Sequence, residues 1–233
     1  MESSVHRQLV FITLTVALSS AANAQSPVVA GVVSKAMALH PNTKRGSALY
    51  AKRCSRCHGS DAWGDGLEDI PSLAGQQELY LVTQIVEFAT RERSGSTMHE
   101  ATGTKDVKNP QAVRDLAHYL NSKPANPDPE HSEDKTSAGG ESLYQRNCAM
   151  CHGTAAQGSH VDPVPALAGQ HYDYTMIQLK SFARGHRGRV AAPVSNFAAG
   201  LSDEDQKSIA DYLSRITPTH AQTHDRARQK ASR

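Results

Sequence analysis

The chain contains two copies of one sequence unit, and this internal repeat constrains its fold more than any other feature. The first copy carries Gly46, Leu49, Tyr50, Cys54, Cys57, His58 and Gly59, and the second repeats them as Gly140, Leu143, Tyr144, Cys148, Cys151, His152 and Gly153. Each pair is 94 residues apart, and the register continues through Pro-x-Leu-Ala-Gly-Gln at 71–76 and 165–170. We therefore expect two similar domains, at residues 40–121 and 138–217, joined by an extended, solvated, proline-rich linker at 122–137.

Each copy contains three helical patterns and no alternating pattern typical of a strand, which predicts an all-α fold. Apolar residues spaced three and four apart predict the second helix at residues 78–90, and at 172–184 in the other copy. The third helix begins at a capping residue, Asn109 before Pro110 in one copy and Ser202 before three acidic residues in the other. These last helices are expected to end near Leu120 and Ile216.

Aromatic residues make up only 5% of the 233 residues. This is a small supply for two separate cores of about 80 residues each, a size at which domains often need a metal, a cofactor or a disulfide. A cofactor is therefore expected to fill part of each core.

The two ends of the chain are predicted to lie outside the folded domains. Residues 1–24 have the pattern of a signal peptide, with an apolar run from Leu9 to Leu18 and Ala22-Asn23-Ala24 before Gln25. That run is too short to span a bilayer, so we expect a soluble periplasmic protein with no membrane anchor. Residues 218–233 form a basic tail without apolar periodicity, expected to be disordered, with a docking role as the alternative. A formal net charge of +2 gives no nucleic-acid-binding signature.

The repeated cysteines belong to two C-x-x-C-H motifs, Cys54-Ser55-Arg56-Cys57-His58 and Cys148-Ala149-Met150-Cys151-His152. This motif is typical of covalent c-type haem attachment. Two thiols three positions apart can bond the two vinyl groups of one macrocycle, and the adjacent imidazole then coordinates its iron. The sequence therefore predicts two covalently bound haem c groups, with His58 and His152 as iron ligands.

Other uses of the cysteines agree less well with the sequence. A redox-active C-x-x-C needs a βαβ setting, which the pattern lacks. The cysteine pairs of zinc sites usually lie about 15–20 residues apart, whereas the gap between Cys57 and Cys148 is far longer. A disulfide within C-x-x-C would close a very short loop and add little stability.

These motifs, the Leu-Ala-Gly-Gln segments and the helix start at 201–205 together resemble the two-domain di-haem class I cytochromes c, of the c-four type. The resemblance covers about residues 44–217. It implies two tandem class I cytochrome c domains related by internal duplication, each wrapped around a covalent haem c. It also implies that the carbonyl of Pro71 holds the other ring nitrogen of His58, and that Pro165 does so for His152. A simple loop turn is the alternative for each proline.

The resemblance further implies a methionine as the sixth iron ligand, on the loop between the second and third helices. Met98 is expected to fill this role in the first domain, because it lies in a polar segment where a thioether has no packing reason to be. Its neighbour His99 is the competing ligand, and a surface methionine without a role is the third possibility.

The second domain departs from this pattern. The position equivalent to Met98 is Ala192, or Ala191 with a one-residue deletion, and neither can bind iron. Met150, between the anchoring cysteines, and Met176, inside the second helix, are poorly placed. The sixth position of haem 2 is therefore filled by a histidine, approached by a weak group, or open to water. The histidine candidates are His186, His160 and His171, and the weak group is Asn196.

Two arginines, Arg93 and Arg187, match across the copies just before the ligand position. They are candidate contacts for the haem propionates, because an arginine fork suits a carboxylate. Solvated loop charges are the alternative. Tyr80, Gln84 and Phe88, with their repeat partners, are expected to line the pockets and the domain interface.

The leading functional hypothesis is a monomeric electron carrier, not an enzyme. The resemblance implies redox partners such as a quinol-oxidising complex, a terminal oxidase or a periplasmic dehydrogenase. Because methionine raises a haem potential relative to histidine, haem 2 is predicted to have the lower potential. The alternative is a haem enzyme or a protein binding a small ligand or anion at an open haem 2, near the basic residues Arg184, Arg187 and Arg189.

Overall fold

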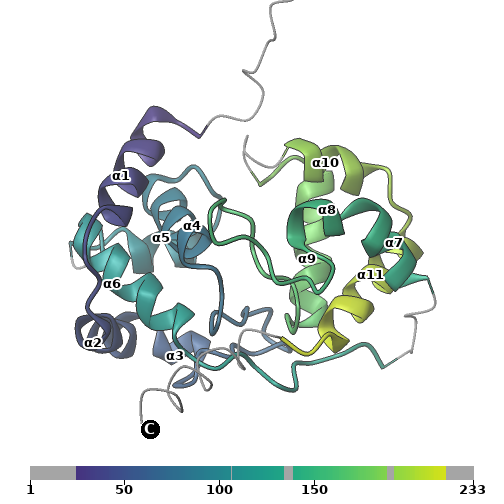
Figure 1. The fold of residues 1–233 in the computed structure, drawn as a ribbon, viewed down its shortest axis with the longest axis horizontal. Helices are drawn as coiled ribbons and strands as arrows, with labels where there is room; N and C mark the ends of the chain where they lie inside the picture. Colours follow the sequence, from purple (N-terminus) through teal and green to yellow (C-terminus); the bar gives the residue numbers. More distant parts are fainter. Residues whose placement is uncertain (1–24, 106, 134–138, 188–191, 219–233) are drawn as a thin grey trace, which may run out of the picture.

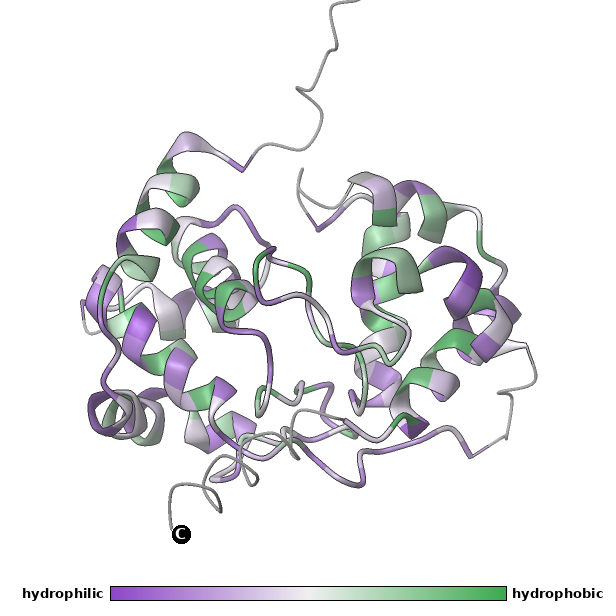
Figure 2. Ribbon diagram, in the orientation of Figure 1, coloured by the Kyte–Doolittle hydropathy of each residue, from purple (hydrophilic) through white to green (hydrophobic). Residues whose placement is uncertain are grey.

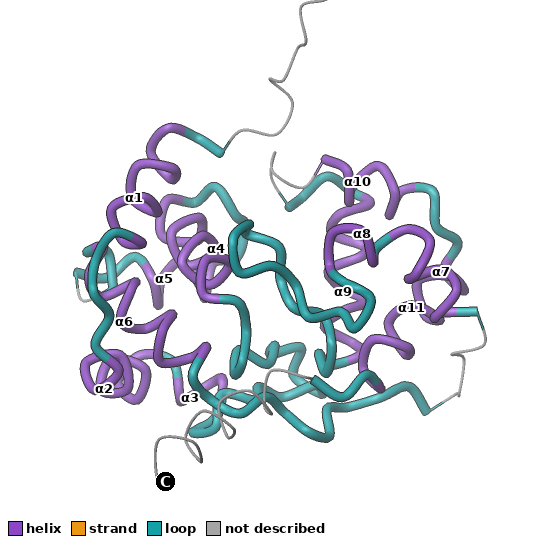
Figure 3. Tube along the Cα trace, in the orientation of Figure 1, coloured by secondary structure: helices purple, strands orange, loops and turns teal. Residues whose placement is uncertain are grey.

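The computed structural model describes residues 25–105, 107–133, 139–187 and 192–218. Their regular structure is helical, and no strand occurs among them, which confirms the predicted all-α class (Figures 1 and 3). The predicted signal peptide, nearly all of the basic tail and part of the linker lie outside the described residues. No helix within the described ranges is long and apolar enough to cross a membrane.

The helices form two groups that lie side by side, which we call the first and second lobes (Figure 1). The first lobe contains α1 (Pro27–Met37), α2 (Thr43–Arg53), α3 (Ser55–His58), α4 (Glu78–Thr90), α5 (Ser96–Thr102) and α6 (Pro110–Asn121). The second lobe contains α7 (Gly140–Asn147), α8 (Ala149–His152), α9 (Tyr172–Ala183), α10 (Ala192–Ala199) and α11 (Asp203–Arg215).

The predicted helix starts agree with the structure. The side chain of Asn109 accepts a hydrogen bond from the backbone of Ala112 and caps α6. Ser202 and Asp205 form a reciprocal capping box at the start of α11. Helix α4 has the expected bounds, and α9 ends one residue earlier than expected. Polar and apolar residues alternate around these helices, as expected of amphipathic helices that cover a core (Figure 2).

In each lobe, the helix before the cysteines crosses the last helix at a glycine. A Cβ atom on Gly46 would collide with the backbone carbonyl of Asp115, and one on Gly140 would collide with that of Ser208. Beside each crossing, a buried tyrosine packs against a second ring at 5.6 Å between centroids, Tyr50 on Tyr119 and Tyr144 on Tyr212. The repeated glycine and tyrosine therefore define the helix crossing that frames each site.

The first lobe has a helix that the sequence analysis did not predict. Helix α1 is capped by Ser26 and packs against α4 and α6, with Val29, Val33 and Ala36 in the core. The expected first domain began at residue 40, whereas the packed unit begins before it. The second lobe has no such helix among its described residues, so the two cores differ in size.

The connector between the lobes is packed rather than extended into solvent as expected. Asn126 is buried, and the indole N–H of Trp63 donates to the carbonyl of Pro124 at 3.0 Å. The carbonyl of Glu130 accepts from the backbone of Tyr172 at 3.2 Å, and Arg215 donates to that of Ser132. The polar composition of this segment reflects hydrogen bonds to both lobes as well as contact with water.

Candidate haem-binding sites

The two C-x-x-C-H segments form equivalent one-turn helices, α3 and α8. All four thiols are free; Cys57 and Cys151 are exposed, and Cys54 and Cys148 are half-buried. Burial raises the pKa of the Cys54 thiol, and likewise that of Cys148, to about 11, with the neighbouring cysteine as a second cause. A redox-active C-x-x-C has a lowered thiol pKa, so this chemistry does not fit.

A zinc site built from both cysteine pairs does not fit either. Within the described ranges, which include all four cysteines, no three histidine, cysteine or acidic side chains are close enough to hold a metal ion. Each motif is instead an isolated pair of thiols beside one imidazole. This donor set suits thioether attachment of a haem, with one protein nitrogen left for its iron.

The two imidazoles are oriented in the same way. His58 Nδ1 lies 3.1 Å from the carbonyl oxygen of Pro71, and His152 Nδ1 lies 3.0 Å from that of Pro165. Because a carbonyl only accepts, Nδ1 carries the proton and the Nε2 lone pair remains for iron. Burial lowers the pKa of both rings, against the opposing effect of the carbonyl, and this favours the neutral form that binds a metal.

A tight turn in each lobe places these proline carbonyls. Ala62 and Ala156 are fully buried in left-handed backbone conformations, with φ of 67° and 54°. The carbonyl of Ala62 accepts from the backbone of Leu73 and Ala74, and the same pair of bonds recurs at Ala156. The segment after each histidine is therefore folded back so that its proline faces the ring.

The two candidates for the sixth ligand of the first haem, Met98 and His99, have different surroundings. Met98 is half-buried on α5, a helix that packs against α4. The ring of His99 turns toward the end of α4, where its Nδ1 lies 2.9 Å from the carbonyl of Phe88. One nitrogen of His99 thus already has a backbone partner, whereas the thioether of Met98 has no comparable role.

The second lobe has a different distal element, helix α10, which packs on α9. The side chains of α10 that are buried or half-buried are Val194, Ser195, Phe197 and Ala198, and Asn196 is exposed. Met150 is 93% exposed and Met176 is buried within α9. No thioether or imidazole lies among the described residues of α10.

The histidine candidates for haem 2 are placed elsewhere. His186 is exposed after α9, where its carbonyl accepts from the hydroxyl of Ser94 at 3.2 Å. His171 is buried between the lobes, and both ring nitrogens are engaged, Nε2 with the carbonyl of Trp63 at 2.7 Å and Nδ1 with the N–H of Glu130 at 3.2 Å. His171 as an iron ligand was wrong, because a polar junction between lobes uses its ring. His160 is exposed.

The two matched arginines have unequal surroundings. Arg93 is buried at the junction between the lobes. It donates to Gln84 at 2.6 Å, to the hydroxyl of Tyr174 at 3.1 Å and to Gln178 at 3.2 Å. Its guanidinium also stacks over Phe88 at 4.3 Å. Arg93 is therefore a tie between lobes, not the solvated charge that was its alternative.

Arg187 has buried N–H groups that make no hydrogen bond among the described residues. Its Nη2 lies 3.3 Å from the hydroxyl of Tyr80 across the junction, while Nε and Nη1 are buried without an acceptor among the described residues. Buried N–H groups left without an acceptor cost free energy, and a carboxylate oxygen suits a guanidinium donor. A haem propionate would satisfy them, so the residues present fit the group that the motif implies.

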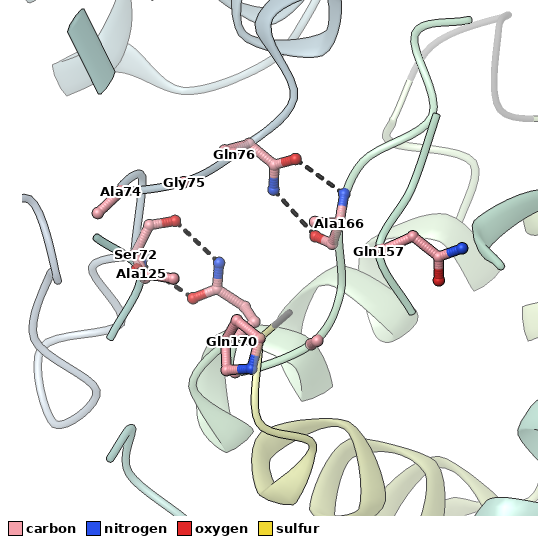
Figure 4. Close-up of a pocket in the computed structure, with 11 residues that line it drawn as sticks. Ser72, Ala74, Gly75, Gln76, Ala125, Gln157, Ala166 and Gln170 are labelled. Carbon is pink, nitrogen blue, oxygen red and sulfur yellow. Dashed lines mark hydrogen bonds between the residues drawn. The ribbon is translucent and has the colours of Figure 1, made fainter. Parts of the chain in front are cut away.

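The lobes are joined by pairs of contacts that repeat with exchanged partners (Figure 4). The amide of Gln76 donates to the carbonyl of Ala166 at 2.9 Å and accepts from its N–H at 2.8 Å. The amide of Gln170 makes the same two bonds with Ser72, at 3.0 and 2.9 Å. The junction therefore has approximate twofold symmetry, like the interface of a homodimer.

The sequence analysis placed Tyr80 and Gln84 at the interface but missed these glutamines. Their signal was present in the repeated Leu-Ala-Gly-Gln segment, which keeps a glutamine at the same place in both copies. The next residue along each copy extends the symmetry. The side chain of Gln77 donates to the carbonyl of Gln157 at 2.5 Å, and in the other copy Nε2 of His171 lies 2.7 Å from the carbonyl of Trp63.

Comparison with known proteins agrees with this geometry. The cytochrome c family model matches residues 43–124 and 137–217. "Cytochrome c4" of Thiocapsa roseopersicina is 34% identical over 178 residues, covering 69% of this chain and 85% of that protein. The "Thiosulfate dehydrogenase electron acceptor" of Thiomonas intermedia is 28% identical over 180 residues, covering 72% and 82%.

A solved structure shows the same architecture. Reduced recombinant cytochrome c4 from Pseudomonas stutzeri matches with a TM-score of 0.65 at 27% identity, covering 76% of this chain and all of that one. Two attachment motifs in two packed lobes, with relatives of this kind, give two covalent haem c groups and an electron carrier rather than an enzyme. The chain belongs to the cytochrome c family and, within it, to the two-domain di-haem cytochromes c4.

Proposed function

We propose that this chain carries single electrons between redox proteins of the periplasm, with one haem in each lobe. The observation that carries the proposal is the repeated His–Pro geometry beside free thiol pairs, at 3.1 and 3.0 Å in the two lobes. Haem c supplies reversible one-electron chemistry at its iron when bound. The protein supplies the ligands, their orientation and the separation from water.

Each residue of the proposed sites has a stated role. Cys54 and Cys57 would hold the first haem, with His58 and Met98 as the ligands of its iron. Cys148 and Cys151 would hold the second haem, with His152 as a ligand of its iron. Arg187 would neutralise a propionate with the donors that have no acceptor among the described residues.

The junction between the lobes supports transfer between the two haems. It is built from hydrogen bonds to backbone groups and from hydrogen bonds of Arg93 and Arg187 to side chains of the opposite lobe. Such a junction would hold the two haem sites in one arrangement.

The proposed partners are a periplasmic dehydrogenase or a quinol-oxidising complex as donor and a terminal oxidase as acceptor. The name of the Thiomonas relative supports a dehydrogenase, because that protein accepts electrons from thiosulfate dehydrogenase.

The test is a redox titration of the purified holoprotein followed by its visible spectrum. We expect two haem c per chain, two one-electron steps and a lower potential for haem 2. Replacing the thioether in Met98→Ala should lower the potential of the first step alone. Two equal, high potentials, or a variant that leaves both unchanged, would contradict the assignment of the ligands.

A further inference from the structure

We infer that Tyr50 and Tyr144 are positioning residues for the iron-binding histidines, because each hydroxyl holds the peptide group that follows its histidine. The inference rests on the proposed function and deepens it, since it requires a haem iron at His58 and at His152. Ring packing at the helix crossings accounts for the two aromatic rings but not for their hydroxyl groups.

Each tyrosine hydroxyl donates to the carbonyl oxygen of the glycine that follows the histidine. The distance is 2.6 Å from Tyr50 to Gly59, and it is also 2.6 Å from Tyr144 to Gly153. The two tyrosines are 1% and 0% exposed. Burial raises the pKa of both, so each hydroxyl keeps its proton and acts as a donor at neutral pH. The same short, buried hydrogen bond therefore stands beside both attachment motifs.

The glycine after each histidine is a flexible point in the backbone. Gly59 ends α3 with a φ of 76°, and Gly153 ends α8 with a φ of 81°. Glycine adopts these left-handed conformations without strain, but it adopts many others equally well. An unpartnered peptide group at this position could rotate and take the histidine backbone with it. The tyrosine hydroxyl fixes an orientation that glycine by itself would leave free.

The histidine backbone is held on its other sides by hydrogen bonds that also repeat. The N–H of His58 donates to the carbonyl of Cys54 at 3.0 Å, and the carbonyl of His58 accepts from the N–H of Gly64 at 3.1 Å. The same two bonds at His152 measure 2.9 and 2.8 Å. Gly64 also lies against Pro71, because a Cβ on this glycine would be 2.6 Å from the proline carbonyl oxygen. The histidine and the carbonyl that binds its ring thus belong to one hydrogen-bonded unit, which the tyrosine completes.

The two lobes differ in how much they depend on the hydroxyl. The carbonyl of Gly153 also accepts from the backbone N–H of Ala156 at 3.0 Å. No backbone N–H of the described residues donates to the carbonyl of Gly59. Loss of the hydroxyl should therefore disturb the first site more than the second.

The consequence for the iron is a change in the donor strength of its histidine. The hydrogen bond from Nδ1 to the proline carbonyl makes the imidazole a stronger donor, and a stronger donor favours ferric iron. A histidine with a loosened backbone keeps this hydrogen bond for less of the time. Its iron is then easier to reduce, so the reduction potential of that haem rises.

The experiment compares Tyr50→Phe and Tyr144→Phe with the wild-type holoprotein, after the haem content of each has been measured. In a redox titration, each variant should raise one of the two potentials and leave the other unchanged, and the two variants should not raise the same one. The shift should be larger in Tyr50→Phe. Nuclear magnetic resonance of the reduced proteins should show faster hydrogen exchange of the histidine Nδ1–H at the same haem.

The matched controls are Tyr119→Phe and Tyr212→Phe, which remove the hydroxyl from the other ring of each pair. The hydroxyl of Tyr119 accepts from Lys123 at 3.2 Å, and that of Tyr212 accepts from Gln145 at 3.4 Å. Neither bond involves an attachment motif. Both controls should leave the two potentials and the two exchange rates unchanged, even where they lower the stability.

Two outcomes would overturn the inference. Potentials and exchange rates that stay unchanged in Tyr50→Phe and Tyr144→Phe would leave the hydroxyls a purely structural role, and so would equal shifts in the controls. If Tyr50→Phe does not retain two haems, Tyr144→Phe decides, because Ala156 still donates to Gly153 in that variant. A wild-type protein with fewer than two haems would instead contradict the proposed function.

Discussion

The two lobes of this protein agree on one side of each haem site and differ on the other. On the attachment side, the cysteines, the histidine and the proline carbonyl are repeated, with histidine-to-carbonyl distances of 3.1 and 3.0 Å. In the segment between the second and the last helix, the first lobe has Met98 on α5, whereas α10 of the second lobe contains neither methionine nor histidine.

This difference follows from what each side has to do. Covalent attachment needs two thiols at one spacing and a neutral imidazole held in one orientation, so few sequences satisfy it. The distal side sets the potential and the access to the iron, and many side chains are compatible with a folded lobe there. A duplicated chain can therefore keep two attachment sites while it uses its two irons differently.

The lobes also differ in how their cores are closed. Helix α1 covers α4 and α6 in the first lobe, and Val29, Val33 and Ala36 extend its core. The described part of the second lobe has no counterpart, and its cluster of buried apolar residues is smaller. We expect the second lobe to be the more sensitive to loss of its haem.

The largest effect is predicted for removal of the attachment cysteines. The double variant Cys148→Ala/Cys151→Ala should lose the second haem and leave the one with the higher potential. The matched variant Cys54→Ala/Cys57→Ala should leave the haem with the lower potential. Mass spectrometry and the pyridine haemochrome spectrum measure the haem content, and a redox titration measures the potential that remains. Equal potentials in the two variants would break the comparison between the lobes.

A second prediction concerns the glycines at the helix crossings. Gly46→Ala and Gly140→Ala should each destabilise the protein by about 3 kcal/mol, because the new methyl group would collide with a backbone carbonyl of the facing helix. The control is Gly31→Ala on α1, where a Cβ meets nothing within 4 Å. This control should stabilise α1 by up to about 1 kcal/mol. Thermal unfolding of the three holoproteins measures the changes. If Gly140→Ala does not lower the stability, α7 and α11 are less closely packed at their crossing than α2 and α6.

A third prediction tests the symmetry of the junction. Gln76→Ala and Gln170→Ala each remove two hydrogen bonds to the backbone of the opposite lobe, at 2.8–3.0 Å. Each change should cost about 2 kcal/mol, at about 1 kcal/mol per bond. Chemical denaturation of the holoprotein measures this cost. Clearly unequal losses of stability would show that one of the two glutamines contributes most of the free energy that joins the lobes.

The smallest effect is a pH dependence confined to the first lobe. Burial alone would raise the pKa of Asp115, but hydrogen bonds from Arg45, the backbone of Asn42 and Gln111 outweigh it and lower the pKa. Its contribution to stability is present above the pKa of the unfolded chain, about 3.9, and is lost as the pH falls through the lower folded value.

The variant Asp115→Asn should therefore cost about 1 kcal/mol at neutral pH, and this cost should shrink as the pH falls below about 3.9. Unfolding curves at several pH values measure this difference. The equivalent residue of the second lobe is Ser208, which carries no charge, so Ser208→Ala serves as the control and should show no such pH dependence. If the change in stability caused by Ser208→Ala also depended on pH, a group other than Asp115 would be responsible for the pH dependence.

Much of the fold could be read from the sequence because its signals are local. The caps at Asn109 and Ser202 and the amphipathic spacing of α4 depend on residues within a few positions of each other. The attachment motif is equally local, since its spacing alone matches the macrocycle. Helix α1 was missed because Pro27–Met37 precedes the repeat and has no second copy to confirm it.

The roles of the arginines and of His171 needed the tertiary structure. Arg93 and Arg187 are equivalent in sequence, yet only Arg187 has buried donors without an acceptor. His171 was a ligand candidate until the structure placed Trp63 and Glu130 on its two nitrogens. Those partners lie far away in the chain, so no local pattern points to them.

The sequence by itself thus determined that two haems are attached, which histidines face them and that the second site lacks a methionine in register. The tertiary structure alone decided how the lobes are tied together, which arginine has donors free for a carboxylate and where each alternative ligand lies. The physical reason is range. Attachment and capping act between neighbours along the chain, whereas burial and hydrogen-bond partners at a junction are set by how the lobes pack.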